Sequence, residues 1–131
     1  MHVKAKVVIR GSKGSVELTA LVDAGSSMTV VDRGLAEAIG VEYTDRERVI
    51  VTASGQEIVG KVAIVKELIV EYEPLKFGRV LVMDFSENVK EGLKNLGVSD
   101  SMVLGMTTLE SAGFMPDTTT GKLRRVKLLL I

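Results

Sequence analysis

The chain has 131 residues, enough to bury a substantial core, and we expect a single domain spanning residues 1–131. Seventeen basic and 17 acidic residues cancel, which argues against nucleic acid or an anionic membrane as a partner. The absence of cysteine excludes disulfides, thiol catalysis and zinc–thiolate sites.

The first 22 residues are expected to form a β-hairpin. Apolar residues alternate with polar ones from Val3 to Arg10 and resume this pattern at Val16, after a loop bounded by glycines. The next segment, "TALVDAGSSMTVVD", places Asp23 in a tight turn between two apolar runs that we expect to be buried strands. A buried charge at such a place destabilises the fold unless it is hydrogen-bonded or paired, and it can otherwise be retained for a function.

A short helix is predicted after this turn, because apolar residues recur at helical spacing in "VDRGLAEAIGV". Asp32 can cap its start and Gly40 can end it. A long hairpin is predicted from Arg48 to Tyr72, with Gly55 supplying the positive φ that its turn needs. Another strand follows, from Phe77 to Phe85.

The last third is expected to begin with a polar insertion, residues 86–101, that contains a short helix. An apolar strand from Met102 leads into a helix from about Met106 to Ala112, and "KLRRVKLLLI" closes the chain as a strand. The segments "VVDRGLAEAIGV" and "VLGMTTLESAGF" echo each other weakly and suggest two units related by a pseudo-twofold. The fold class is therefore mostly β, a closed or nearly closed barrel with two short helices.

Four features in order resemble one known family. "LVDAGSSMTVV" resembles the Asp-Thr/Ser-Gly-Ala/Ser signature of aspartic peptidases, and the one-domain length resembles their retropepsin-like branch. "TASGQEIVG" resembles the flap hairpin, "MVLGM" resembles the apolar-apolar-Gly of the second half, and "TTLESAGF" resembles the helix after it. The resemblance implies a retropepsin-like closed β-barrel with a flap, and an aspartic endopeptidase. It assigns substrate binding to Ala53, Ser54, Gly55 and Gln56, and support of the catalytic loop to Leu104 and Gly105.

The resemblance also implies that Asp23 is the catalytic carboxylate, with Ala24, Gly25, Ser26 and Ser27 as its supporting loop. Two carboxylates about 3 Å apart share one proton and can supply both the base and the acid for peptide hydrolysis by water. Gly25 allows the tight turn, and Ser26 can donate a hydrogen bond to the carboxylate. Only one such signature occurs, so the second carboxylate is expected from another copy of the chain in a homodimer.

Ala24 departs from the family, which usually has Thr at this position. The hydroxyl of that Thr reaches across the dimer axis, and each lost hydrogen bond costs roughly 1 kcal/mol. Two other functions stay open: a retropepsin-fold binding or dimerisation module with weak or no hydrolysis, and an unrelated small β-barrel. Asp23 also fits a plain Asx turn, and residues 54–56 fit an ordinary hairpin turn.

We expect a peptide or protein substrate, no metal or cofactor, and no nucleic-acid or membrane partner. A cytoplasmic location is expected, because no signal-peptide block or spanning apolar run occurs. The few Asn and Gln residues among many charges are typical of thermophile proteins. The apolar end, Leu128 to Ile131, is expected to pair either beside the N-terminal strand or with a second copy.

Overall fold

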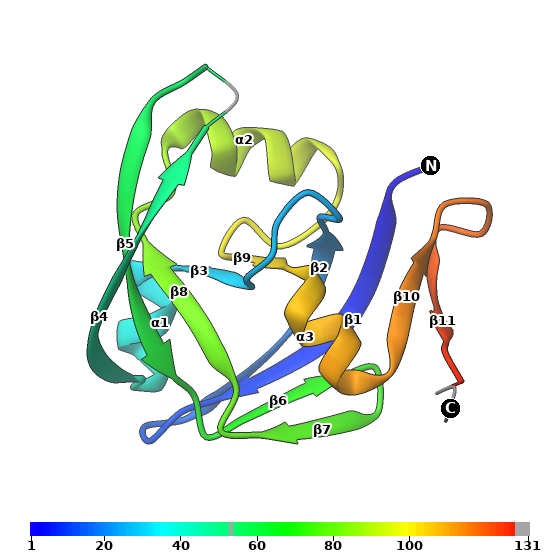
Figure 1. Ribbon diagram of the computed structural model, residues 1–131, viewed down its shortest axis with the longest axis horizontal. Coiled ribbons are helices and arrows are strands. Elements are labelled where there is room, and N and C mark those ends of the chain that lie inside the picture. The colour runs from blue at the N-terminus through cyan, green and yellow to red at the C-terminus, as the bar shows by residue number, and fades with distance from the viewer. Residues whose placement is uncertain (53, 128–131) are drawn as a thin grey trace, which may run out of the picture.

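The structure is a computed structural model that describes residues 1–52 and 54–127. A nine-stranded sheet dominates this part of the chain, and a separate hairpin lies beside it (Figure 1). The order in the large sheet is β4-β5-β8-β3-β9-β2-β1-β6-β7. Its strands are β1 (Val3–Arg10), β2 (Ser15–Val22), β3 (Val30–Asp32), β4 (Glu42–Val51), β5 (Glu57–Ile64), β6 (Glu67–Val70), β7 (Glu73–Lys76), β8 (Arg79–Met83) and β9 (Met102–Leu104). The separate hairpin pairs β10 (Phe114–Asp117) with β11 (Lys122–Arg125).

The N-terminal hairpin has the structure that its alternation predicts. β1 and β2 are antiparallel, in register from Val3 opposite Val22 to Arg10 opposite Ser15. Every second residue of β1 is buried, which gives four apolar side chains to the main core: Val3, Ala5, Val7 and Ile9. The period-2 pattern therefore fixes which face of the hairpin meets the core.

Four strands at the centre of the sheet carry the internal symmetry. β2 runs parallel to β9, β8 runs parallel to β3, and β3 and β9 are antiparallel to each other. Exchanging β2 with β8 and β3 with β9 leaves this set of pairings unchanged. The topology thus supports the pseudo-twofold predicted from the sequence echo. It also makes the β2–β3 loop, which carries Asp23, the counterpart of the long β8–β9 connection.

The helices begin and end where their caps predict. Asp32 accepts a hydrogen bond from the Gly34 amide at the start of α1 (Arg33–Ile39), and Gly40 ends this helix with a φ of 77°. α3 (Met106–Ala112) ends at Gly113 with a φ of 82°. The insertion contains a third helix, α2 (Glu87–Asn95), which Ser86 caps through the Val89 amide.

Two expectations are not matched by the structure, and a third falls on residues outside the described part of the chain. The predicted long hairpin ends at Ile64, because β6 leaves the hairpin and pairs with β1 instead. The large sheet is open within the described residues, with β4 and β7 at its edges, so the predicted closure into a barrel is not confirmed. The last described strand, β11, pairs with β10, and the Lys4 amide of β1 donates to the Gly121 carbonyl just before β11 at 3.2 Å. The prediction for Leu128 to Ile131 lies outside the described residues.

Two apolar clusters stabilise the sheet, one on each side of its central strands. The main core is built mostly from Val, Leu, Ile and Ala. A smaller cluster joins Phe85 and two residues of the insertion, Leu93 and Val98, to the opposite face of the central strands. None of the helices in the described residues is both long enough and apolar enough to cross a membrane.

Candidate active site

The Asp23 loop leaves the sheet at the end of β2 and is held by its own backbone. The Asp23 amide donates to the Leu104 carbonyl at 2.9 Å, which extends the parallel pairing of β2 and β9 by one bond. The Gly25 amide donates to Asp23 Oδ1 at 2.9 Å, and the Ser26 amide donates to the Asp23 carbonyl at 3.1 Å. This is the geometry of an Asx turn. Asp23 itself is exposed, and within the described residues its Oδ2 has no hydrogen-bond partner.

The other loop residues lie around this turn with separate contacts. The side chains of Ala24 and Ser27 are exposed, and Gly25 is exposed beside the carboxylate. Ser26 Oγ donates to the Met28 carbonyl at 2.7 Å, so the hydrogen bond predicted from this hydroxyl to the Asp23 carboxylate is absent from the described chain. The predicted contact was wrong in this respect, because the hydroxyl is already engaged by the carbonyl two residues on. Ser26 stabilises the loop rather than the carboxylate.

The second half of the chain clamps the loop from β9 and α3. The Met106 amide donates to the Ser26 carbonyl at 2.8 Å, and both the amide and the hydroxyl of Thr107 donate to the Ser27 carbonyl, at 2.9 and 2.6 Å. A Cβ on Gly105 would lie 2.3 Å from the Met28 carbonyl carbon and oxygen. Only a residue without a side chain allows this close approach. Leu104 and Gly105 thus lie against the Asp23 loop.

Sequence reasoning did not single out a buried hydroxyl pair beneath the loop. Thr29 Oγ1 and Thr108 Oγ1 lie 2.6 Å apart, and the Gly105 amide donates to Thr29 Oγ1 at 3.1 Å. Both threonines are buried. The only available signal was a hydroxyl in the otherwise apolar run "MTVV", and its partner 79 residues away is a tertiary contact.

The insertion lies on the side of the central strands opposite the main core. Side chains alternate along a strand, so Leu21 of β2 faces away from the main core that Val22 enters. Leu21 packs against the cluster of Phe85, Leu93 and Val98. In the view of Figure 1, α2 lies above β9. The insertion therefore covers the outer face of β2 just before the Asp23 loop begins.

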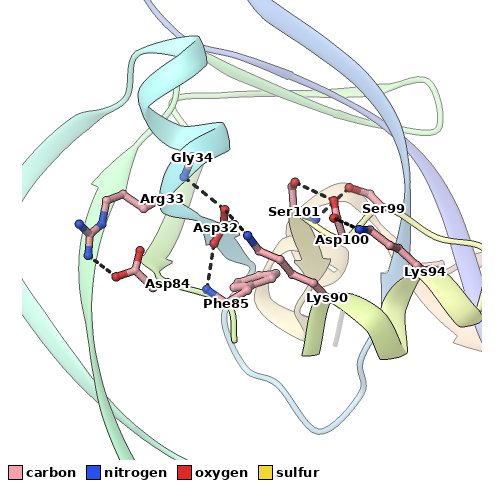
Figure 2. Close-up of polar contacts among 10 residues, drawn as sticks. All are labelled: Asp32, Arg33, Gly34, Asp84, Phe85, Lys90, Lys94, Ser99, Asp100 and Ser101. Atoms are coloured by element: carbon pink, nitrogen blue, oxygen red, sulfur yellow. Dashed lines mark hydrogen bonds and ion pairs between the residues drawn. The ribbon is translucent and has the colours of Figure 1, made fainter. Parts of the chain in front are cut away.

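Hydrogen bonds and ion pairs anchor both ends of the insertion (Figure 2). Asp32, which is only 8% exposed, accepts from the Phe85 amide at 2.8 Å and has Lys90 Nζ 3.9 Å from its Oδ2. Arg33 is paired with Asp84 at the start of the insertion. At its end, Asp100 is 3.5 Å from Lys94 and accepts from the Ser101 hydroxyl. Asp32 thus holds the insertion as well as capping α1.

The flap is the hairpin of β4 and β5, which extends away from the rest of the sheet (Figure 1). Thr52 organises its turn: the Gln56 amide donates to the Thr52 hydroxyl at 3.1 Å, and the Gly55 amide donates to the Thr52 carbonyl at 2.9 Å. Gly55 has the predicted positive φ, 84°. Ser54, Gly55 and Gln56 are exposed at the tip, and Ala53 lies outside the described residues.

A cleft of about 520 Å³ lies between the inner face of the flap, the end of the Asp23 loop and α3. We call it the under-flap cleft. Arg48 and Val62 line it from the flap, Met28 from the Asp23 loop and Thr107 from α3. The segment 74–79 closes its other side. A peptide that lay between the flap and the Asp23 loop would border this cleft.

Three side chains among the described residues have a shifted pKa, and one of them pairs with Lys76 of the cleft lining. Lys76 Nζ lies 2.8 Å from Glu67 Oε2, and this hydrogen bond lowers the pKa of Glu67, with a further contribution from Arg10. Away from the cleft, the Thr119 amide lowers the pKa of Asp117, and partial burial raises that of Tyr43. No group of three or more His, Cys, Asp or Glu side chains in the described part of the chain is placed to hold a metal ion.

Comparisons with known proteins agree with this geometry. No curated protein matches the chain. Forty-six chains of solved structures do, among them a retropepsin-like aspartic protease from Rickettsia conorii, with 18% sequence identity and a TM-score of 0.51 over 89% of each chain. At this identity, the likeness shows a retropepsin-like fold. The family model described as "Aspartyl protease" matches residues 5–108, which include the Asp23 loop, the flap and the start of α3. The chain therefore belongs to the aspartyl protease family.

Proposed function

We propose that the protein is an aspartic endopeptidase that hydrolyses peptide bonds as a homodimer. The observation that carries this proposal is the Asp23 loop itself. It presents an exposed carboxylate with Oδ2 unbonded within the described residues, while Leu104, Met106 and Thr107 hold its backbone in place. A carboxylate that served only the turn would need no such clamp from the other half of the chain.

The second carboxylate is proposed to come from Asp23 of the partner subunit. The pseudo-twofold counterpart of the Asp23 loop is the β8–β9 connection, which holds the insertion instead of a second Asp-Gly turn. The carboxylates at its two ends are engaged: Asp84 with Arg33, and Asp100 with Lys94. A twofold axis brings the same residue of both subunits together and so completes the pair.

The paired carboxylates would share one proton, because like charges so close cannot both ionise. The ionised member takes a proton from water, which attacks the peptide carbonyl, while the protonated member gives its proton to the carbonyl oxygen. The flap would cover the bound peptide and exclude bulk water. Hydrolysis is therefore expected to be strongest below neutral pH.

A retropepsin-fold binding or dimerisation module is the second candidate, and Ala24 favours it. Its exposed methyl group offers no hydroxyl for a hydrogen bond across the proposed dimer axis. A less rigid pair of loops would still bind a peptide but would hold the two carboxylates less accurately. The two candidates differ in whether a bound peptide is cut.

Asp23→Asn tests the proposal, with Asp84→Asn as the matched control. Peptide cleavage, followed by mass spectrometry of a peptide library, is expected to disappear in Asp23→Asn and to persist in Asp84→Asn. If the Asp84 variant also loses activity while it stays folded, the second carboxylate comes from within one chain. Cleavage that survives in Asp23→Asn would refute the proposal.

Mixing the subunits tests the shared site directly. When wild-type and Asp23→Asn chains exchange freely in equal amounts, about one quarter of the dimers carry two wild-type carboxylates. The activity per total protein is then expected to fall to that fraction. A fall to one half would mean that each chain acts alone.

A further inference from the structure

The under-flap cleft carries one sign of charge. Four cationic side chains line it, Arg46, Arg48, Lys76 and Arg79, and no carboxylate is found among the described residues of its lining. The chain as a whole has equal numbers of acidic and basic residues, so this concentration is local. A cleft lined by charges of one sign focuses their potential and attracts ligands of the opposite sign.

Three of these cations are not neutralised by neighbours in the part of the chain that the structure describes. Lys76 pairs with Glu67 at 2.8 Å. The ion pairs within 4.0 Å include none formed by Arg46, Arg48 or Arg79. Three guanidinium groups therefore remain available in one cleft.

Two of the arginines belong to β4, a strand of the flap. Arg48 lies opposite Gly60, and Arg46 lies in the irregular stretch of β4 just before the regular pairing resumes at Glu47. Both line the cleft together with Val62 of β5, whereas the alternate residues Val49, Val51 and Val59 are exposed on the outer face. The inner face of the flap is thus the cationic one.

The three hydroxyl groups in the described lining already have hydrogen-bond partners, and that of Thr108 is paired with Thr29. Thr107 Oγ1 donates to the Ser27 carbonyl at 2.6 Å, and Ser111 Oγ donates to the Thr107 carbonyl at 2.9 Å. An anion in the cleft would therefore be bound by the guanidinium groups. Their planar donor pairs match the two oxygens of a carboxylate.

Apolar surface accompanies these charges. Met28 and Pro74 line the cleft with accessible apolar surface, and Phe77 lines it while remaining 72% exposed. Phe77 has a φ of 57°, which is unfavourable for a residue with a side chain, and its amide donates to the Lys66 carbonyl at 3.0 Å. An apolar surface beside guanidinium groups suits a side chain that has methylene groups and a terminal carboxylate.

We propose that the under-flap cleft binds acidic side chains of the peptide substrate, so that the protein selects peptides with Glu or Asp at a position away from the scissile bond. The proposal rests on the proposed function, because it takes the peptide to lie between the flap and the Asp23 loop. The cleft borders that path through Met28, at the end of the loop, and through the inner face of the flap. Arg46, Arg48 and Arg79 are the specificity-determining residues.

Binding is tested with the Asp23→Asn protein, so that no probe is cut. The probes are two sets of fluorescein-labelled randomised peptides, matched except that one contains glutamates where the other contains glutamines. The glutamate set is expected to bind about 10-fold more tightly at low salt, since a hydrogen bond to a charged group is worth more than one to a neutral group. The difference is expected to shrink as salt screens the charges.

The double variant Arg46→Gln/Arg48→Gln, made in the same background, is expected to bind both sets equally. Lys13→Gln, which removes one charge from the exposed β1–β2 loop outside the cleft, is the matched control and is expected to keep the preference. Equal binding of the two sets to the parent protein would overturn the proposal. So would a preference that persists in the double variant, or the absence of binding to either set.

Cleavage separates this inference from the proposed function. The wild-type protein is expected to cut library peptides with Glu or Asp enriched at one fixed position, and the double variant is expected to lose that enrichment while it still cuts. Cleavage without any acidic enrichment would overturn the inference and leave the endopeptidase intact. Tight binding of the glutamate set without cleavage by the wild-type protein would overturn the endopeptidase and leave the cleft as an acidic-peptide site.

Discussion

Thr29 and Thr108 join the two halves of the chain through a buried hydrogen bond of 2.6 Å between their hydroxyl groups. Thr29 lies at the end of the Asp23 loop and Thr108 lies in α3. Thr29 also accepts the Gly105 amide, so one hydroxyl serves two partners. The position of the Asp23 loop relative to α3 depends on this pair.

Thr29→Val is expected to destabilise the protein by about 1–3 kcal/mol, because it leaves both the Gly105 amide and the Thr108 hydroxyl without a partner. Thr108→Val is the matched control and is expected to cost less, since Thr29 keeps the Gly105 amide. Urea unfolding gives both free energies. Equal costs for the two variants would show that the amide does not depend on Thr29.

Gly105→Ala is expected to weaken the fold and the site together. The new Cβ would lie 2.3 Å from the Met28 carbonyl, so the Asp23 loop must move, at a cost of about 1–3 kcal/mol. Gly92→Ala, in the middle of α2 with no atom within 4 Å of the added Cβ, is expected to stabilise by about 0.5–1 kcal/mol. Thermal unfolding distinguishes the two. A Gly105 variant as stable as the wild type would contradict the tight contact.

Ala24→Thr is expected to strengthen the proposed dimer. A hydroxyl on each loop would add two hydrogen bonds across the axis, worth roughly 1–2 kcal/mol together. Ala24→Val, which has the same shape without the hydroxyl, is the control and is expected to give no such gain. Sedimentation measures the dissociation constant of each variant. A gain in the Val variant as large as in the Thr variant would point to packing instead.

Glu67 is expected to make stability depend on pH in acid. Its hydrogen bond to Lys76 lowers its pKa in the folded protein, so the pair stabilises the fold above the ordinary pKa of a glutamate. This contribution disappears as the pH falls through the lowered value. Glu67→Gln is therefore expected to lower the melting temperature at neutral pH, while in strong acid the variant and the wild type converge. A difference that grows towards acid would reverse the assigned sign.

Local signals predicted the ends of the helices and the tight turns. These signals depend on residues that are close in the sequence: the N-cap Asp32 and the glycines with positive φ at positions 40, 55 and 113. The same holds for the Asp23 turn, in which the bonded atoms are two or three residues apart.

Long-range pairing was harder to predict. β6 follows β5 in the sequence after only Val65 and Lys66, yet it pairs with β1, where Val7 lies opposite Val70, 63 residues away in the chain. Ser26 was expected to contact the carboxylate, but a local carbonyl competes successfully for its hydroxyl. The under-flap cleft is lined by residues of β4, α3 and β7, which are far apart in the sequence. No single segment of the sequence therefore predicts it.

The open sheet also has a consequence for solubility. Within the described residues, its edge strands β4 and β7 each have one side without a neighbouring strand, and another chain can add to such an edge and begin aggregation. β7 has Pro74, which offers no amide hydrogen, and charged residues at both ends. β4 carries four consecutive charges from Asp45 to Arg48, beside a register shift that interrupts regular pairing. Arg46 and Arg48, two of the arginines proposed to select a substrate, therefore also help to keep this edge from pairing with another chain.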